Sequence, residues 1–205
     1  MLHLMPRYCQ WRIASPADSL SIRKQGIRMS LTGLVHRLPQ PVKSAIKDRV
    51  YPSLLGEGEI VPEWALQSYD GKWKRHKNNK WTVMVFYPGD DTPGCTAQLQ
   101  DLQAHYARFQ ELDAQVYAVN PAEAPSHQAF AEKFGFEFPI LTDRGGVVAR
   151  QFRAAVQMPF KTVILRTVYL VNPERKIRLA NRGAPPAEAL VRSIEALQQA
   201  TRGGM

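Results

Sequence analysis

The chain has 205 residues, 44% of them hydrophobic and 22% charged, and its formal net charge is +9. This length and apolar content exclude a wholly disordered chain, and they suit one domain of ordinary core size with an appendage. No apolar run approaches the roughly 20 residues that a membrane-spanning helix needs. Two cysteines far apart in sequence, Cys9 and Cys95, exclude a disulfide framework and indicate a reactive thiol in a reducing compartment.

The charge divides the chain into two parts. Residues 1–50 hold nine Lys and Arg and two acidic residues, a net charge of +7. Residues 51–205 hold eighteen and sixteen, a net charge of +2. We therefore expect a basic N-terminal extension over residues 1–50 and a globular domain over residues 51–205. Nucleic-acid binding would depend on the extension alone, which shows no helix-turn-helix or zinc-finger spacing, so we expect no nucleic-acid partner.

The extension allows more than one interpretation. Its first 30 residues are Arg-rich and poor in acids, and they lack the 7–15-residue apolar core of a secretory signal. They fit a disordered or mis-started segment, with translation beginning at Met29, or a mitochondrial or plastid presequence. The first interpretation leads us to expect a cytoplasmic protein. Loose helical periodicity up to Val50 predicts a short docking helix, and Cys9 is interpreted as an incidental thiol.

The globular domain begins with a predicted β-hairpin. Trp64–Tyr69 and Lys72–Arg75 flank an Asp70-Gly71 turn. The basic run around that turn is typical of a solvated edge. A short apolar run rich in β-branched and aromatic residues follows and predicts a buried strand over Trp81–Tyr87. Pro88 and Gly89 end that strand.

The next predicted helix carries the second cysteine. An apolar stripe at helical spacing consists of Leu99, Leu102, Tyr106 and Phe109. Thr92 is a good N-cap, and Pro93 takes the first helical position. Cys95 therefore lies in the first helical turn, where the positive end of the helix dipole favours the thiolate, which is the nucleophilic form. The alternative is a small buried core residue.

Strands and helices alternate through the rest of the domain. Strands are predicted at Gln115–Val119, Pro139–Leu141, Thr167–Val171 and Lys176–Ala180. Helices are predicted at Ser126–Phe134, Val147–Phe152 and Pro185–Ala200. This order predicts an α/β domain with a central mixed β-sheet, helices on both faces and the hairpin at its N-terminal end.

The cysteine segment resembles a known family. Pro88 to Cys95 fits the peroxiredoxin signature of Pro, three residues, Thr or Ser, two residues and Cys. The fuller string FYPGDDTPGCT resembles the peroxiredoxin Q (bacterioferritin-comigratory protein) branch of the AhpC/TSA-type redoxins. Residues 130–143 and 165–177 resemble later segments of that branch, and the family's active-site Arg falls on Arg166. The resemblance covers roughly residues 56–200 and implies a thioredoxin-like fold.

A peroxidase site is what this resemblance implies. It makes Cys95 the nucleophile that cleaves the peroxide O–O bond, and it implies catalytic roles for Thr92, Arg166 and Pro88. Without the resemblance, Thr92 would be a plain N-cap and Arg166 a surface strand residue. The helix-start argument itself places the N–H groups of Gly94 and Cys95 where they could hold a peroxide oxygen.

Recycling of the oxidised cysteine departs from the family pattern. Gln100 stands where many members of the branch carry a resolving Cys. The sequence therefore predicts a one-Cys cycle with an external thiol such as thioredoxin or glutathione, recruitment of Cys9 being the alternative. We expect a hydroperoxide substrate, no cofactor, no metal, and a monomer or homodimer. His76, His105 and His127 are isolated, and the two in helices are interpreted as polar-face residues. The competing function is a non-enzymatic redox sensor built on the same fold.

Overall fold

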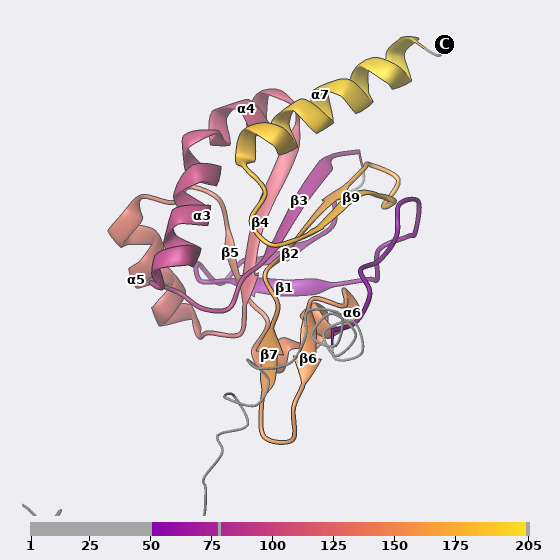
Figure 1. Ribbon diagram of the computed structural model, residues 1–205. Coiled ribbons are helices and arrows are strands. Elements are labelled where there is room, and N and C mark those ends of the chain that lie inside the picture. The colour runs from indigo at the N-terminus through magenta and orange to yellow at the C-terminus, as the bar shows by residue number, and fades with distance from the viewer. Residues whose placement is uncertain (1–50, 78, 204–205) are drawn as a thin grey trace, which may run out of the picture. The chain divides into compact units, whose positions relative to one another are not determined.

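The computed structural model describes residues 51–77 and 79–203 (Figure 1). The expected basic extension, its docking helix and Cys9 lie outside these residues. None of the described helices is both long enough and apolar enough to cross a membrane.

The centre of the domain is a seven-stranded mixed sheet in the order β2-β1-β5-β4-β3-β8-β9. β3 runs parallel to β4 and antiparallel to β8, so the predicted mixed sheet is confirmed. The strands are β1 (Ala65–Ser68), β2 (Trp73–Arg75), β3 (Trp81–Phe86), β4 (Ala114–Asn120), β5 (Ile140–Thr142), β8 (Thr167–Val171) and β9 (Ile177–Arg182). β1 and β2 form the predicted N-terminal hairpin.

Helices lie on both faces of this sheet because β3 is buried on both sides. Val83 and Val85 face one core, while Met84 and Phe86 face the other. The first core is covered by α3 (Pro93–Ala104), α4 (Tyr106–Glu111), α5 (Ala124–Phe134) and α7 (Ala187–Gly203). The second core is closed by α6 (Val147–Gln151) and by apolar residues between Leu55 and Leu66. Figure 1 shows α3 and α5 together on one side of the sheet.

The predicted long helix after Cys95 is divided into two. His105 leaves the helical region (φ −107°, ψ 7°), so α3 ends there and α4 begins. Its N–H donates to Leu102 O at 3.3 Å, and its own carbonyl accepts the first bonds of α4 from Arg108 and Phe109. The predicted apolar stripe is nevertheless buried at Leu99, Leu102 and Phe109. The break therefore changes the direction of the helix without exposing its apolar side.

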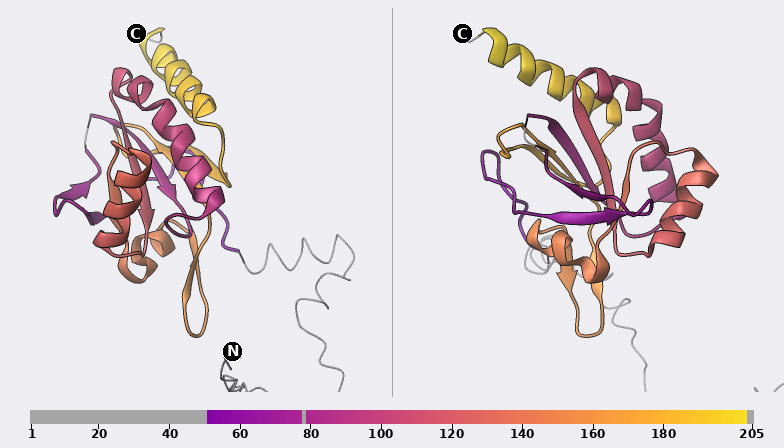
Figure 2. Two further views of the ribbon diagram at one scale, coloured as in Figure 1. Left: turned by 90° about the vertical axis from the view of Figure 1, so that its left-hand side faces the viewer. Right: turned by 180° about the vertical axis from the view of Figure 1, so that it is seen from behind.

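A second, two-stranded sheet was not predicted. β6 (Ala155–Gln157) and β7 (Thr162–Ile164) are three-residue strands that pair antiparallel. Figures 1 and 2 show this hairpin projecting from the end of the domain away from the C-terminus of α7. β7 is followed directly by Leu165 and Arg166. The hairpin therefore delivers Arg166 to the start of β8, where the sequence resemblance placed it.

Candidate active site

Cys95 lies in the first turn of α3, as the sequence predicts. Its side chain is buried, with 1% of the residue exposed. The N–H of Cys95 donates to Thr92 O at 3.0 Å, and Thr96 N–H donates to the same oxygen at 2.8 Å. These bonds close the first turn of the helix onto Thr92. The sulfur thus meets the positive end of the helix dipole inside the protein, where water does not screen that field.

Arg166 reaches the sulfur from a different part of the chain. Its Nη2 donates to Cys95 Sγ at 3.1 Å, and its Nη1 donates to Gly94 O at 3.2 Å. The guanidinium, which is always charged, thus lies in direct contact with the sulfur. The structure therefore brings together the two residues that the resemblance paired, although 71 positions separate them in sequence.

Gln98 orients the guanidinium and was not singled out in the sequence. Its Oε1 accepts a hydrogen bond from Arg166 Nη1, and its side chain is buried. Gln98 lies one helical turn after Cys95, so both side chains point to the same side of α3. This spacing was the sequence signal for Gln98, because a polar side chain beside the apolar stripe is buried with it and then needs a hydrogen-bond partner.

The remaining predicted residues lie in the segment that leads from β3 to Cys95. Pro88, Thr92 and Gly94 are all exposed. Thr92 has the extended backbone of an N-cap (φ −93°, ψ 141°), but its hydroxyl makes no capping bond and lies 3.4 Å from Gly89 O. The predicted N-cap position is therefore confirmed, while the hydroxyl itself does not cap the helix. Because the Cys95 N–H is already bonded to Thr92 O, only the Gly94 N–H is left from the predicted pair of peroxide donors.

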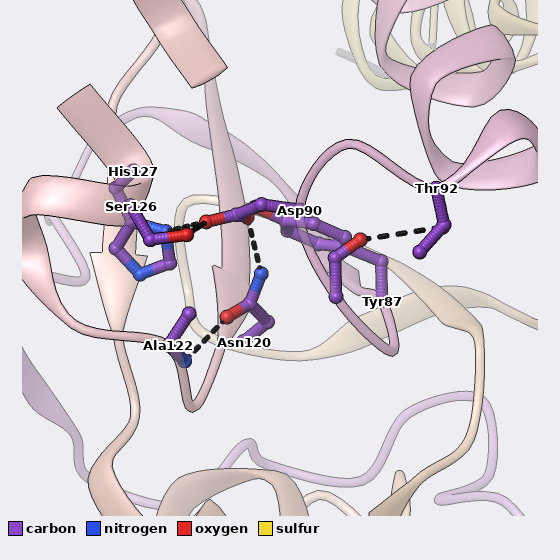
Figure 3. Close-up of polar contacts among 8 residues, drawn as sticks. Tyr87, Asp90, Thr92, Asn120, Ala122, Ser126 and His127 are labelled. Atoms are coloured by element: carbon purple, nitrogen blue, oxygen red, sulfur yellow. Dashed lines mark hydrogen bonds and ion pairs between the residues drawn. The ribbon is translucent and has the colours of Figure 1, made fainter. Parts of the chain in front are cut away.

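Asp90 forms a polar cluster beside these residues, drawn in Figure 3. Its carboxylate accepts hydrogen bonds from Tyr87 Oη and Asn120 Nδ2, both at 2.6 Å. Ser126 Oγ donates to its other oxygen at 2.6 Å, and His127 Nδ1 lies 2.9 Å from that oxygen. Tyr87 is fully buried, and burial followed by the nearby Asp90 charge raises its pKa well above the usual value, so it stays a donor.

The position of His127 corrects the sequence interpretation. The sequence interpretation makes it a polar-face helix residue, but it is completely buried. The signal was present, because His127 precedes Phe130 by three positions and Phe134 by seven, which puts all three on one side of α5. His105, by contrast, is partly exposed, with 32% of its side chain accessible. Among residues 51–77 and 79–203, no group of three or more His, Cys, Asp or Glu side chains is placed to hold a metal ion.

Comparison with known proteins covers most of the domain. Residues 58–180 match the AhpC/TSA family. The chain is 26% identical over 193 residues to the chloroplastic peroxiredoxin Q of Populus jackii, an alignment that spans 91% of this chain and 90% of that one. The resemblance inferred from the cysteine signature is thereby confirmed.

Solved structures agree with this assignment. A variant of peroxiredoxin Q from Xylella fastidiosa superimposes with a TM-score of 0.66 at 25% identity, covering 72% of this chain and 99% of that one. Peroxiredoxin Q from Xanthomonas campestris gives a TM-score of 0.58 at 30% identity, covering 65% and 90%. The predicted thioredoxin-like fold is confirmed by these neighbours.

The expected cytoplasmic location is contradicted by the same comparisons. Plant relatives from Populus jackii, Triticum aestivum, Gentiana triflora and Suaeda salsa are all described as chloroplastic. The cytoplasmic expectation depended on interpreting the N-terminal residues as disordered or mis-started, and the cysteine count did not correct it because chloroplast and cytoplasmic proteins can carry equally few. Cysteine content separates secreted disulfide scaffolds from other proteins and does not distinguish the compartments inside the cell.

Proposed function

The chain belongs to the AhpC/TSA family and is a peroxiredoxin, a thiol-dependent peroxidase; on this premise we propose that Cys95 is its peroxidatic residue. The observation that carries the proposal is the 3.1 Å contact from Arg166 Nη2 to the buried Cys95 Sγ. An arginine on the sulfur and a helix start beneath it favour the nucleophilic thiolate. Neither feature is needed by a cysteine that only fills space in a core.

The first chemical step is a displacement at oxygen. The Cys95 thiolate attacks one oxygen of the hydroperoxide, an S–O bond forms and the O–O bond breaks. Cysteine becomes a sulfenic acid, and the leaving alkoxide or hydroxide takes a proton from solvent. Negative charge moves from sulfur to the leaving oxygen, so a donor that spans both atoms stabilises the transition state most.

Arg166 and the start of α3 supply such donors. The guanidinium carries several N–H groups in a fixed plane and can contact the sulfur and a peroxide oxygen together. The Gly94 N–H and the Thr92 hydroxyl would hold the second oxygen, and Pro88 would limit the access of water to the sulfur.

We propose a one-Cys cycle for the second half of the reaction. Gln100 is exposed on α3 at the position where a resolving cysteine would stand, and Cys95 is the single cysteine among the described residues. An external thiol would attack the sulfenic sulfur, releasing water and leaving a mixed disulfide. A second thiol would then release the Cys95 thiolate. Thioredoxin and glutathione are the candidate reductants.

Hydrogen peroxide and organic hydroperoxides are the proposed substrates. The relative from Xanthomonas campestris, 29% identical, is described as having alkyl peroxide reduction activity. Pro88, Thr92 and Gly94 are exposed, and a substituent on the second oxygen would extend past them into solvent. For residues 1–50, the chloroplastic relatives favour the presequence interpretation, which a fusion of these residues to a fluorescent protein in leaf cells would test.

Peroxide consumption by the wild type and by Cys95→Ser tests the proposal. Each protein is supplied in turn with thioredoxin and its reductase, with glutathione, and with a small dithiol. The wild type should turn over repeatedly with at least one thiol, while Cys95→Ser should consume no peroxide above the blank. Activity retained in Cys95→Ser would contradict the assignment. Oxidation of the wild type once, without turnover, would favour the redox sensor instead.

A further inference from the structure

The Asp90 carboxylate joins three elements that are distant in sequence. Tyr87 directly follows β3, Asn120 ends β4, and Ser126 and His127 lie in the first turns of α5. All four side chains meet Asp90, whose own side chain is 6% exposed. Figure 3 shows Asp90 between the α5 residues on one side and Tyr87 on the other. The loop from residue 88 to residue 92 is thereby attached to the β4–α5 corner through one side chain.

The charge state of this carboxylate matches its partners. Burial alone would raise the pKa of Asp90, but hydrogen bonds from His127, Ser126 and Tyr87 outweigh that effect and lower the pKa to about 2. The cluster therefore holds a carboxylate at neutral pH, with every neighbour donating to it. Such charge-assisted bonds are shorter and stronger than neutral ones.

The adjacent residue provides a contrast within the same loop. Asp91 has a left-handed backbone (φ 50°), and its carboxylate pairs with Lys133 of α5 at 2.6 Å. More than half of each of these two side chains is exposed. An exposed pair of this kind fixes little, because water and salt screen it. Of the two carboxylates that connect the loop to α5, Asp90 alone is shielded from solvent.

The loop matters because it carries the N-terminus of α3. Cys95 lies just after this loop, whereas the backbone of Arg166 lies beside β8, where its carbonyl accepts the Gly183 N–H at 2.9 Å. Only its guanidinium reaches α3, at Gly94, Gln98 and Cys95. The 3.1 Å contact therefore depends on where the loop holds the start of α3 relative to β8. The sulfur is almost completely buried, and the helix start that carries it directly follows this loop. A bulky thiol therefore needs this part of the chain to move before it can touch that sulfur.

We propose that Asp90 is a positioning residue for the peroxidase: its carboxylate fixes the 88–92 loop against α5, which holds Cys95 at Arg166 for the peroxide step and limits the access of the reducing thiol. This inference rests on the proposed role of Cys95. The two halves of the cycle then favour opposite states of the loop. A fixed loop favours the reaction with a small peroxide, and a released loop favours the reaction with a large thiol.

Asp90→Asn and its neighbour Asp91→Asn form a matched pair of variants. Both remove one charge from the same loop, and Asn tolerates the left-handed backbone at position 91. The rate constant for the reaction with hydrogen peroxide is measured by rapid mixing and quenching. It refers only to reactive Cys95, which is counted as the amount that one equivalent of peroxide has oxidised at the end of the reaction. Asp90→Asn should lower it by about tenfold to a hundredfold, the scale of a misplacement near 1 Å. Asp91→Asn should stay within about twofold of the wild type.

Access of the thiol is measured on the sulfenic acid in the same proteins. Its rates with glutathione and with 2-mercaptoethanol are compared, because glutathione is much the larger thiol. Glutathione is also charged, and Asp91→Asn, which removes one charge from the same loop, controls for that difference. In Asp90→Asn the ratio of the glutathione rate to the mercaptoethanol rate should rise, by about threefold or more if the loop opens readily. A purely structural defect would lower the number of reactive cysteines and leave both the rate per cysteine and this ratio unchanged.

Two substitutions at His127 test the cluster from the other side. Among the described residues His127 Nε2 has no hydrogen-bond partner, so the contact that matters is Nδ1 to Asp90. His127→Asn places an amide N–H close to the position of Nδ1 and should keep most of the peroxide rate. His127→Leu removes the donor and should reproduce the defect of Asp90→Asn. These variants also serve if Asp90→Asn does not fold.

The outcomes separate the two proposals. No peroxide reaction in any folded variant, the wild type included, would contradict the role of Cys95 itself. A wild type that reacts, with Asp90→Asn indistinguishable from Asp91→Asn, would contradict the positioning role alone. An equal loss of the peroxide rate in His127→Asn and His127→Leu would also contradict it, because the donor would then not matter.

Discussion

Two buried carboxylates follow strands β3 and β5 of the central sheet, which lie on either side of β4, and they serve different purposes. Asp90 follows β3 and receives hydrogen bonds from side chains of three separate elements. Asp143 follows β5 and accepts the backbone N–H groups of Val148 and Ala149 at 3.0 and 2.7 Å. Asp143 therefore completes the start of α6, within a local group called here the Asp143 corner. Asp90 with its four partners, the Asp90 corner, fixes the loop that leads to the reacting cysteine. Burial alone does not reveal which of the two carboxylates contributes to the reaction. The difference is that the partners of Asp143 come from the adjoining helix, whereas those of Asp90 come from three separate elements.

The largest expected effect is on the rate of the reaction at the Cys95 sulfur. Arg166→Ala should lower the rate constant for hydrogen peroxide by about 10²–10³, the cost of removing one donor from a developing charge. The midpoint of thermal unfolding should change little, because the side chain is only half-buried. The rate is measured by rapid mixing. Wild-type kinetics in this variant would show that Arg166 is no more than a residue at a strand start.

The Asp143 corner should respond in the opposite way. In Asp143→Asn, the NH₂ group of the new side chain faces the backbone N–H of Val148 or Ala149, which then loses its acceptor. The free energy of unfolding should therefore fall by about 1–3 kcal/mol. The peroxide rate per reactive Cys95 should stay that of the wild type. Urea unfolding and rapid mixing on the same sample measure both quantities. A loss of rate without a loss of stability would remove the contrast between the two corners.

Acid should weaken the Asp90 corner selectively. The pKa of Asp90 is about 2 in the folded protein against an ordinary value of 3.8. The folded state thus binds its proton less readily, and the resulting stability is fully present above pH 5 and is lost as the pH falls towards 2. The difference corresponds to about 2 kcal/mol. The difference in unfolding free energy between wild type and Asp90→Asn should therefore shrink between pH 5 and pH 2.5. A difference independent of pH would show that the carboxylate charge is not involved.

The smallest effect is expected at the exposed Asp91–Lys133 ion pair beside Asp90. Lys133→Ala removes the partner of Asp91, whose side chain is 53% exposed. Double-mutant cycles on such pairs typically give about 0.2–1 kcal/mol, and we expect the lower end here. Thermal unfolding and the peroxide rate should both remain close to the wild type. A marked loss of rate would mean that Asp91, and not Asp90 alone, fixes the loop.

Local pattern predicted the fold better than it predicted the site. The buried strand before Pro88, the helix start at Pro93 and the position of Cys95 all follow from short-range signals, and the structure agrees with them. The break at His105 was missed because the apolar stripe continues through it. The β6–β7 hairpin was missed because its strands have three residues each, too short for a periodic signal.

The Asp90 cluster was missed for a different reason. Asn120 and His127 lie 30 and 37 positions from Asp90 in the sequence, so no local spacing relates them. Contacts of this range depend on strand order and on the corner between β4 and α5. Only the burial of His127 was predictable, from its place on the apolar side of α5. The Arg166 contact was predicted through the family resemblance and not from physical reasoning on the sequence.

Intact mass after stepwise addition of peroxide tests the central claim most directly. With one equivalent the protein should gain a single oxygen, mapped by peptide analysis to Cys95. A further excess should add a second oxygen there, because no thiol among the described residues can trap the sulfenic acid. Added glutathione should instead give a mixed disulfide at Cys95. The loss of two hydrogens, with Cys9 joined to Cys95, would contradict the one-Cys cycle, and the absence of any oxygen on Cys95 would contradict its role as the peroxidatic residue.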